Sequence, residues 1–178
     1  MNDRAKLEIL GEGRFLRLKR EGRWEYVSRV QANGAVHILA TTARQDIILV
    51  EQERVPVKAR TIELPAGIVG DEALHRGETV EACALRELLE ETGYRAREAC
   101  LVYSGPTAPG LTSEIVHLAR IVGAEKAGGG GGVDGENISV HVTAPARIEA
   151  FLEEKRREGF LIDPRIYLGL YFLRTEGS

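Results

Sequence analysis

The first sixty positions of the chain carry short stretches rich in β-branched, aromatic and other apolar residues. These stretches cover 7–10, 14–18, 24–30, 36–39 and 47–50. Turn-forming residues, among them Gly11, Gly22 and Gly34, separate them, a pattern typical of antiparallel strands. A further strand is expected over 61–64, where the proline and glycine in 65–67 should end it.

The apolar positions change to a helical period over 79–92. Ala82, Leu85 and Leu89 recur on one stripe there, and Gly93 is placed to end the helix. Further strands and helices are expected over 99–103, 115–122, 138–142, 146–158 and 163–174. Because strands dominate the first half and the helix must pack its apolar stripe on them, the pattern predicts an α/β fold, an α/β/α sandwich with a mixed sheet.

The length of the chain allows one substantial hydrophobic core, since 43% of its 178 residues are hydrophobic. We expect an N-terminal antiparallel strand region over 1–34 and a main domain over 35–178. Asp163 and Pro164 form a plausible N-cap and first residue for the last helix.

Charge and cysteine content exclude several classes of function. A net charge of −3 gives no overall reason to bind nucleic acid or an anionic membrane. No uninterrupted apolar run approaches about 18 residues, so we expect no membrane-spanning segment. Cys83 and Cys100 are too few for a disulfide scaffold and have no zinc-site spacing, which favours a reducing cytoplasm.

Five consecutive glycines occupy 128–132, between two expected strands. Such a run predicts a flexible connector, in the simplest case a mobile hairpin loop. The alternative is that it allows the acidic segment behind it to swing over a bound substrate.

The helix over 79–92 carries the strongest chemical signal. Residues four apart lie one above the other on a helix, so Glu87 and Glu91 share a face, with Glu90 beside them. Like charges placed in this way repel, so the face needs a counter-ion, either Arg86 or a metal. Carboxylates without His or Cys suit hard divalent cations such as Mg²⁺. The alternative is a solvated acidic face with ordinary salt bridges.

The spacing of these charges resembles the box of the Nudix family. Glu78, seven residues, and then Arg-Glu-Leu-Leu-Glu-Glu-Thr-Gly-Tyr over 86–94 match every charged position and the final glycine of that box. Two positions depart from it. Glu72 stands where the box has glycine, and the nearest glycine, Gly67, implies a five-residue insertion; Tyr94 replaces an aliphatic residue.

Outside the box, the chain resembles the ADP-ribose pyrophosphatase branch of the family from about Phe15 to Leu173. In the segment over 50–54, Glu53 replaces the aromatic residue of that branch. The segments similar to that branch are 24–29, 50–54, 63–67, 104–114 and 134–138.

The resemblance implies a metal site on the acidic helix. Glu87, Glu91 and the backbone carbonyl of Ala66 would hold Mg²⁺, with Mn²⁺ able to substitute, and Glu90 would join a second or third ion. Arg86 would orient the glutamates through charge-assisted hydrogen bonds. The alternative for Arg86 is an ordinary surface salt bridge.

The same resemblance implies a substrate site. Arg29 and Arg54 would bind phosphate or ribose oxygens, unless they are plain solvated arginines, and Gly110 and Glu114 belong to the substrate loop. Trp24 would stack on the nucleobase, across the interface of a homodimer that exchanges N-terminal strands, whereas a tryptophan in a strand is more often a core residue.

The implied reaction is hydrolysis of the pyrophosphate bond of a nucleoside diphosphate sugar, first of all ADP-ribose to AMP and ribose 5-phosphate. Glu136, on a loop outside the metal helix, is the expected general base. The alternative for Glu136 is an ordinary solvated residue of an acidic turn. Two alternatives are another nucleotide sugar, such as GDP-mannose or UDP-glucose, and a module that senses ADP-ribose without turnover. Such a module would be expected to lack the metal glutamates, which are present here.

Overall fold

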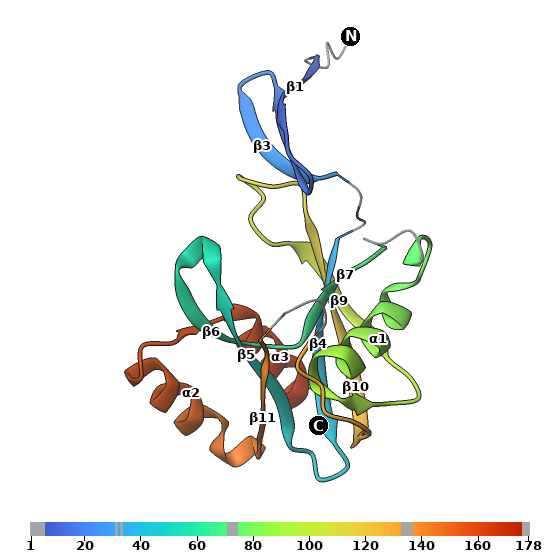
Figure 1. Ribbon diagram of the computed structural model, residues 1–178, viewed down its shortest axis with the longest axis vertical. Coiled ribbons are helices and arrows are strands. Elements are labelled where there is room, and N and C mark those ends of the chain that lie inside the picture. The colour runs from blue at the N-terminus through green and yellow to red at the C-terminus, as the bar shows by residue number, and fades with distance from the viewer. Residues whose placement is uncertain (1–5, 31, 33, 71–74, 133–136, 176–178) are drawn as a thin grey trace.

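The computed structural model describes residues 6–30, 32, 34–70, 75–132 and 137–175, which form two sheets and three α-helices. The first sheet is antiparallel, in the order β1 (Leu7–Glu12), β2 (Leu16–Glu21) and β3 (Trp24–Arg29). It projects from the main body of the molecule (Figure 1). This agrees with the antiparallel strands expected at the N-terminus, while the division into domains at residue 34 stays a prediction.

The second sheet has nine strands within the described residues and forms the main body. Its path is β12-β6-β5-β4-β10-β8, with β11 on β5, β7 on β4 and β9 on β10. The parallel pairs β4–β10 and β6–β12 among antiparallel ones confirm the expected mixed sheet. The strands are β4 (Ala35–Thr42), β5 (Ile47–Arg54), β6 (Ala59–Glu63), β7 (Ala66–Ile68), β8 (Tyr94–Arg95), β9 (Cys100–Pro106), β10 (Ile115–Lys126), β11 (Ser139–Thr143) and β12 (Leu161–Ile162).

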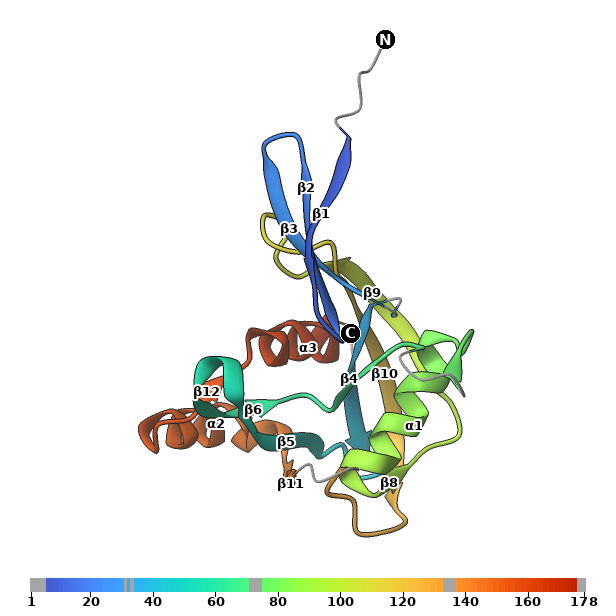
Figure 2. The same ribbon diagram turned by 45° about the horizontal axis from the view of Figure 1, so that its top comes forward.

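Helices cover both faces of this sheet (Figure 2). They are α1 (Val80–Thr92), α2 (Ile148–Arg157) and α3 (Pro164–Thr175), with short 3₁₀ turns η1 (Val55–Val57) and η3 (Pro145–Arg147). Along β4, Val36 and Ile38 pack in the core beneath α1, whereas Leu39 packs in the core shared with α2 and α3. The expected α/β/α sandwich is therefore confirmed. Across the described ranges, no helix is long and apolar enough to cross a bilayer.

The face by which α1 packs on the sheet differs from the predicted stripe. Ala82 and Leu89 are exposed, and the buried apolar residues are Cys83, Ala84 and Leu88. The prediction was wrong because it placed the carboxylates on the side opposite the core. In the structure the apolar face runs directly beside the acidic one, so Glu91 is itself buried.

Pro65 ends β6, as expected, but the chain continues at once as the short strand β7. The carbonyl of Pro65 accepts a hydrogen bond from the backbone N–H of Ile38 at 2.8 Å, and β7 then pairs with β4. β6 pairs with β5 instead. The proline therefore marks the point where the chain leaves one ladder and enters another, beside α1.

The glycine run is not the free connector that its composition predicts. Gly131 and Gly132 donate backbone hydrogen bonds of 2.8 and 3.1 Å to the carbonyls of Glu91 and Glu90. A Cβ on Gly130 would lie 2.3 Å from the carbonyl carbon of Thr92. The run thus packs against the C-terminus of α1 and satisfies carbonyls that the helix leaves without partners.

This packing distinguishes two neighbouring glycines. Gly130 has φ +74° and no room for a side chain, whereas a Cβ on Gly129 would meet nothing within 4 Å. We expect Gly130→Ala to lower the free energy of unfolding by roughly 1–3 kcal/mol, and Gly129→Ala to change it by less than about 1 kcal/mol. Urea denaturation measures both. Equal effects of the two substitutions would show that the run acts as a flexible tether.

Candidate active site

Arg86 collects the carboxylates of the acidic helix around one guanidinium. Its Nη1 donates to Glu87 at 2.9 Å and to Glu90 at 3.0 Å, and its Nη2 donates to Glu78 at 3.0 Å. Burial would lower the pKa of Arg86, but the bond to Glu78 and the charge of Glu87 outweigh it and raise the pKa. One cation therefore offsets much of the repulsion among the glutamates.

Glu87 and Glu91 turn toward β7. A Cβ on Gly67 would lie 2.0 Å from Oε1 of Glu87, so only glycine allows this approach. The backbone N–H of Ala66 donates to Oε2 of Glu91 at 3.0 Å. The insertion before Glu78 therefore leaves Gly67 against the acidic helix, while the position of Glu72 lies outside the described residues.

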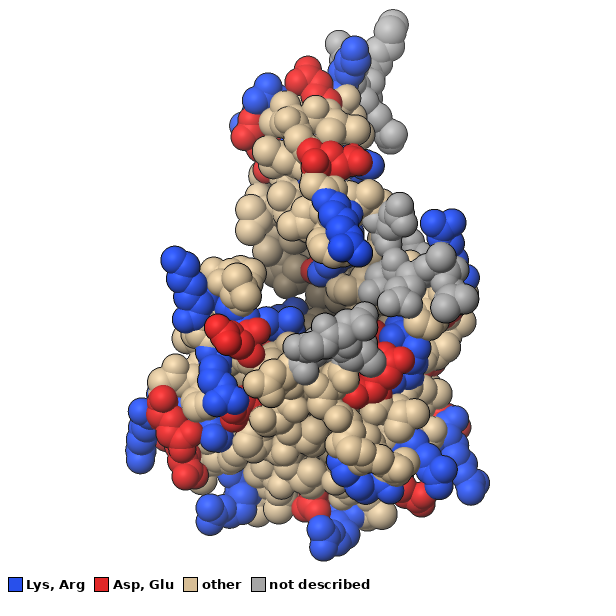
Figure 3. All heavy atoms as spheres, viewed as in Figure 1, with Lys and Arg blue, Asp and Glu red and all other residues tan. Residues whose placement is uncertain are grey.

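Six of the residues expected at the site line one cavity of about 620 Å³. They are Arg29, Arg54, Ala66, Glu87, Glu91 and Glu114. The surface is hollowed below the projecting N-terminal sheet, and Lys and Arg side chains lie at the border of the hollow (Figure 3). The structure thus brings β3, β5, β7, α1 and the start of β10 to one place.

The two expected substrate arginines are each paired with a carboxylate. Arg29 donates to Glu114, so the fold brings together two residues that lie 85 positions apart in the sequence. Arg54 forms a two-pronged pair with Glu63, both bonds being 2.7 Å. Burial would raise the pKa of Glu63, but the hydrogen bonds from Arg54 and Thr61 outweigh it and lower the pKa. Both arginines are thereby held in place on the cavity wall.

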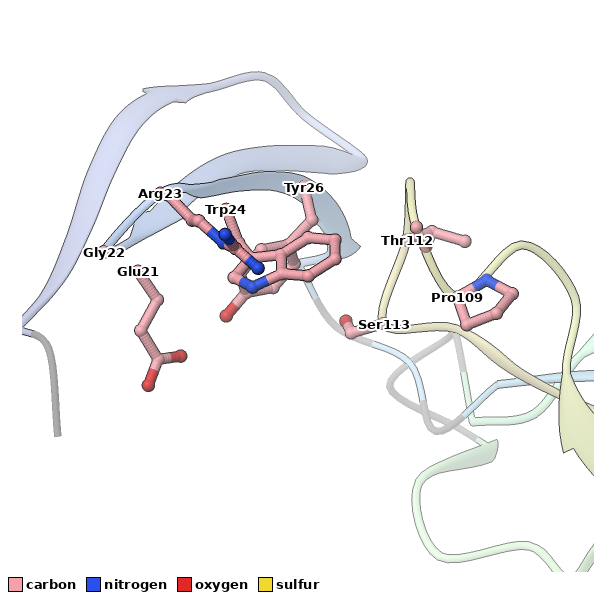
Figure 4. A pocket seen from close by; sticks show the side chains of 9 residues that line it. Glu21, Gly22, Arg23, Trp24, Tyr26, Pro109, Thr112 and Ser113 are labelled. Atoms are coloured by element: carbon pink, nitrogen blue, oxygen red, sulfur yellow. The ribbon is translucent and has the colours of Figure 1, made fainter. Parts of the chain in front are cut away.

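Trp24 and Gly110 line a different cavity. It has a volume of about 540 Å³ and lies between β3 and the β9–β10 loop, with Tyr26, Pro109 and Ser113 in its wall (Figure 4). The side chain of Trp24 is 56% exposed, which excludes the core alternative. Within one chain, the indole is therefore not in the wall of the cavity that holds Glu87 and Glu91.

The predictions for Glu90 and Glu136, the other two acidic residues expected at the site, have different outcomes. Glu90 bonds to Arg86 and is not among the residues that line the cavity. Glu136 lies outside the described residues. In the described part of the chain, no three His, Cys, Asp or Glu side chains are gathered closely enough to hold a metal ion.

The cavity also contains residues to which sequence reasoning assigned no role in it, namely His37, Asp163 and Arg165. His37 is 5% exposed on β4 and accepts a hydrogen bond from Arg165 at 2.8 Å. Burial and the charge of Arg165 lower the pKa of His37 to about 4. The available signal was a histidine inside an otherwise buried apolar strand, and an Asp-Pro-Arg sequence that served only to mark a helix start.

Comparison with known proteins places this geometry in a family. A family model described as NUDIX domain matches residues 31–160. The chain is 32% identical over 149 residues to a methanol dehydrogenase activator of Bacillus methanolicus, covering 83% of this chain and 75% of that one. It is 34% identical over 155 residues to a GDP-mannose pyrophosphatase of Cronobacter sakazakii, covering 83% and 76%.

A third relative is an ADP-ribose pyrophosphatase of Bacillus subtilis (strain 168), 44% identical over 89 residues, which are 50% of this chain and 45% of the relative. A crystal structure of an ADP compounds hydrolase superposes with a TM-score of 0.72 and 20% identity over 95% of this chain and 90% of that one, which shows the shared fold. Because the family model spans most of the chain, and two relatives above 30% identity are covered over three quarters of their length, the chain belongs to the Nudix family.

Proposed function

We propose that this protein hydrolyses the pyrophosphate bond of a nucleoside diphosphate sugar with the help of Mg²⁺. The observation that carries the proposal is the cavity in which Glu87 and Glu91 of α1 meet Arg29 and Arg54. Carboxylates for a divalent cation and arginines for phosphate oxygens are the two kinds of group that a diphosphate requires.

The donor set fits Mg²⁺. Glu87 and Glu91 supply carboxylate oxygens, Ala66 lines the same cavity, and Nε2 of His37, the histidine in its wall, is bonded to Arg165. Mg²⁺ commonly takes one or two carboxylates and completes its shell with waters and substrate phosphates, so a cluster of three side chains is not required. When bound, the cation would neutralise phosphate charge and make the attacking water more acidic. Mn²⁺ prefers similar ligands and is expected to substitute.

The chain's own residues then have distinct roles. Arg86 orients Glu87, and it also positions Glu90 to bind a further metal ion. Arg29 and Arg54 bind phosphate or ribose oxygens, with Glu114 fixing Arg29. Water adds to one phosphorus, the bridging P–O bond breaks, and two phosphate monoesters leave.

Glu136 is our candidate for the base that takes the proton of the attacking water. It follows the glycine run, whose backbone bonds to the carbonyls of Glu90 and Glu91 join this part of the chain to the metal helix. A base of this kind contributes typically about 10²–10⁴-fold to the rate.

ADP-ribose is the first candidate substrate and GDP-mannose the second. The Bacillus subtilis ADP-ribose pyrophosphatase has the higher identity over half of the chain, whereas the Cronobacter GDP-mannose pyrophosphatase matches over 83% of it.

Cys83 and Cys100 are both free thiols, which supports a cytoplasmic location.

A homodimer would explain the separate position of Trp24. The N-terminal sheet exposes large apolar side chains, a surface that monomers rarely leave uncovered. These side chains are Leu7, Ile9, Leu10, Phe15, Leu16, Leu18 and Trp24. We infer that this sheet pairs with a second copy and carries Trp24 to the nucleobase in the partner's cavity.

A panel assay tests the proposed function. Purified protein with Mg²⁺ is incubated with ADP-ribose, GDP-mannose, UDP-glucose and the corresponding nucleoside triphosphates, and products are separated by ion-exchange chromatography. We expect turnover of ADP-ribose to AMP and ribose 5-phosphate, loss of turnover with EDTA, and its recovery with Mn²⁺. Binding of ADP-ribose without turnover of any nucleotide sugar would instead identify a sensing module.

Trp24→Ala tests the stacking role. Stacking holds the ground and transition states alike, so the substitution should raise KM several-fold and leave kcat within about two-fold. Tyr167→Ala is a matched control, because Tyr167 is an exposed aromatic residue on α3 outside both cavities. A KM unchanged by Trp24→Ala in a dimer of normal stability would remove Trp24 from the site.

A further inference from the structure

A third arginine shares the cavity with the acidic helix. Arg165 lies in the first turn of α3, on the face of the sheet opposite α1, and lines the cavity together with Arg54 and Glu91. Its side chain is 30% exposed, so it is held in the wall and still reaches the open space. Neither the box nor the segments similar to the ADP-ribose pyrophosphatase branch include this residue.

Asp163 and His37 fix the guanidinium of Arg165. Oδ1 of Asp163 accepts from Nε at 2.7 Å and from the backbone N–H of Arg165 at 2.7 Å, and Oδ2 accepts from Nη2. Nη1 donates to Nε2 of His37 at 2.8 Å. Burial would lower the pKa of Arg165, but the bonds and charge of Asp163 outweigh it and raise the pKa, so the group stays charged.

The bond to His37 has only one possible direction. Arginine has no acceptor atom, so Nε2 of His37 must accept and the ring is neutral, with its proton on Nδ1. His37 faces Ala66 across the β4–β7 ladder. A neutral acceptor orients Arg165 without cancelling its charge, beside a residue that we place at the metal site.

Arg165 keeps two donors for a ligand. A guanidinium has five N–H groups, and the bonds within the described part of the chain use one on Nε, one on Nη1 and one on Nη2. One N–H therefore remains on each Nη. Two donors on adjacent nitrogens match two oxygens of one phosphate.

Arg54 lies close enough to Arg165 for the two charges to repel. The charge of Arg54 acts to lower the pKa of Arg165, while the charges of Glu91 and Asp163 act to raise the pKa of Arg54. Glu63 pairs with Arg54 and Asp163 pairs with Arg165, and both carboxylates also line the cavity. If Arg165 served only to form a salt bridge at the start of α3, Asp163 alone would be enough. Two positively charged side chains held in place on one cavity wall instead form a site that suits an anion.

We propose that Arg165 and Arg54 together bind phosphate oxygens of the diphosphate on the cavity wall opposite α1, with His37 and Asp163 as positioning residues for Arg165. The inference rests on the proposed function and extends it, because it assigns a phosphate contact to the C-terminal helix. The substrate is then held between the metal carboxylates of α1 and the cations of β5 and α3.

Calorimetric titration with the α,β-methylene analogue of ADP-ribose, at saturating Mg²⁺, tests the contact without turnover. A charge-assisted pair of hydrogen bonds corresponds to roughly ten- to a hundred-fold in affinity, so we expect Arg165→Gln to raise Kd by that factor. Arg174→Gln is the matched control, since Arg174 lies on the same helix, pairs with Glu149 and does not line the cavity. Its Kd should stay within about two-fold of the wild type.

Substitutions at His37 test the positioning role. His37→Gln keeps an acceptor for Nη1 and should bind the analogue within about two-fold of wild type, whereas His37→Leu removes the acceptor and should raise Kd several-fold. If Arg165→Gln does not fold, as judged by circular dichroism, Arg165→Lys replaces it. Lysine keeps the charge beside Asp163 but lacks the two-pronged geometry, so it should also raise Kd several-fold.

The outcomes separate the two proposals. A folded Arg165 variant that binds the analogue as tightly as Arg174→Gln overturns the contact while the proposed function stands. Wild-type protein that neither binds the analogue nor hydrolyses any nucleotide sugar overturns the proposed function itself.

Discussion

The repulsion among the carboxylates of α1 is the constraint on which the rest of the site depends. Glu87, Glu90 and Glu91 lie within little more than one turn, and such a group is stable only when cations surround it. Arg86 supplies one from the helix itself, and the glycine at position 67 lets Glu87 lie against β7. Glu87 and Glu91 line a cavity in which, by our proposal, a divalent ion completes the balance.

The balance of opposite charges also organises the cavity wall across from α1. Each arginine that lines the cavity pairs with a carboxylate of the same cavity: Arg29 with Glu114, Arg54 with Glu63 and Arg165 with Asp163. Each pair fixes a long side chain before substrate arrives, which lowers the entropy lost on binding. The mixed sheet makes this possible, because β5, β7 and α3 bring groups from distant parts of the chain to one cavity.

Much of the fold and the presence of the acidic helix were predictable from local sequence pattern. Period and turn residues predicted the order of the longer elements, and the charge spacing over 78–93 predicted the acidic helix. What local pattern does not encode is which way a helix faces and which distant groups meet. The buried face of α1 was mispredicted because a buried carboxylate, Glu91, adjoins it, and the contact of His37 with Arg165 joins residues 128 positions apart.

The central claim is that Glu87 and Glu91 hold the divalent cation in the substrate cavity, and the affinity for Mg²⁺ tests it most directly. Calorimetric titration compares the wild type with Glu91→Gln and with Glu81→Gln, a control on the first turn of the same helix that does not line the cavity. The account predicts an affinity lowered about ten-fold or more by Glu91→Gln and unchanged by Glu81→Gln. Equal Mg²⁺ affinity in the wild type and a folded Glu91→Gln variant would contradict it.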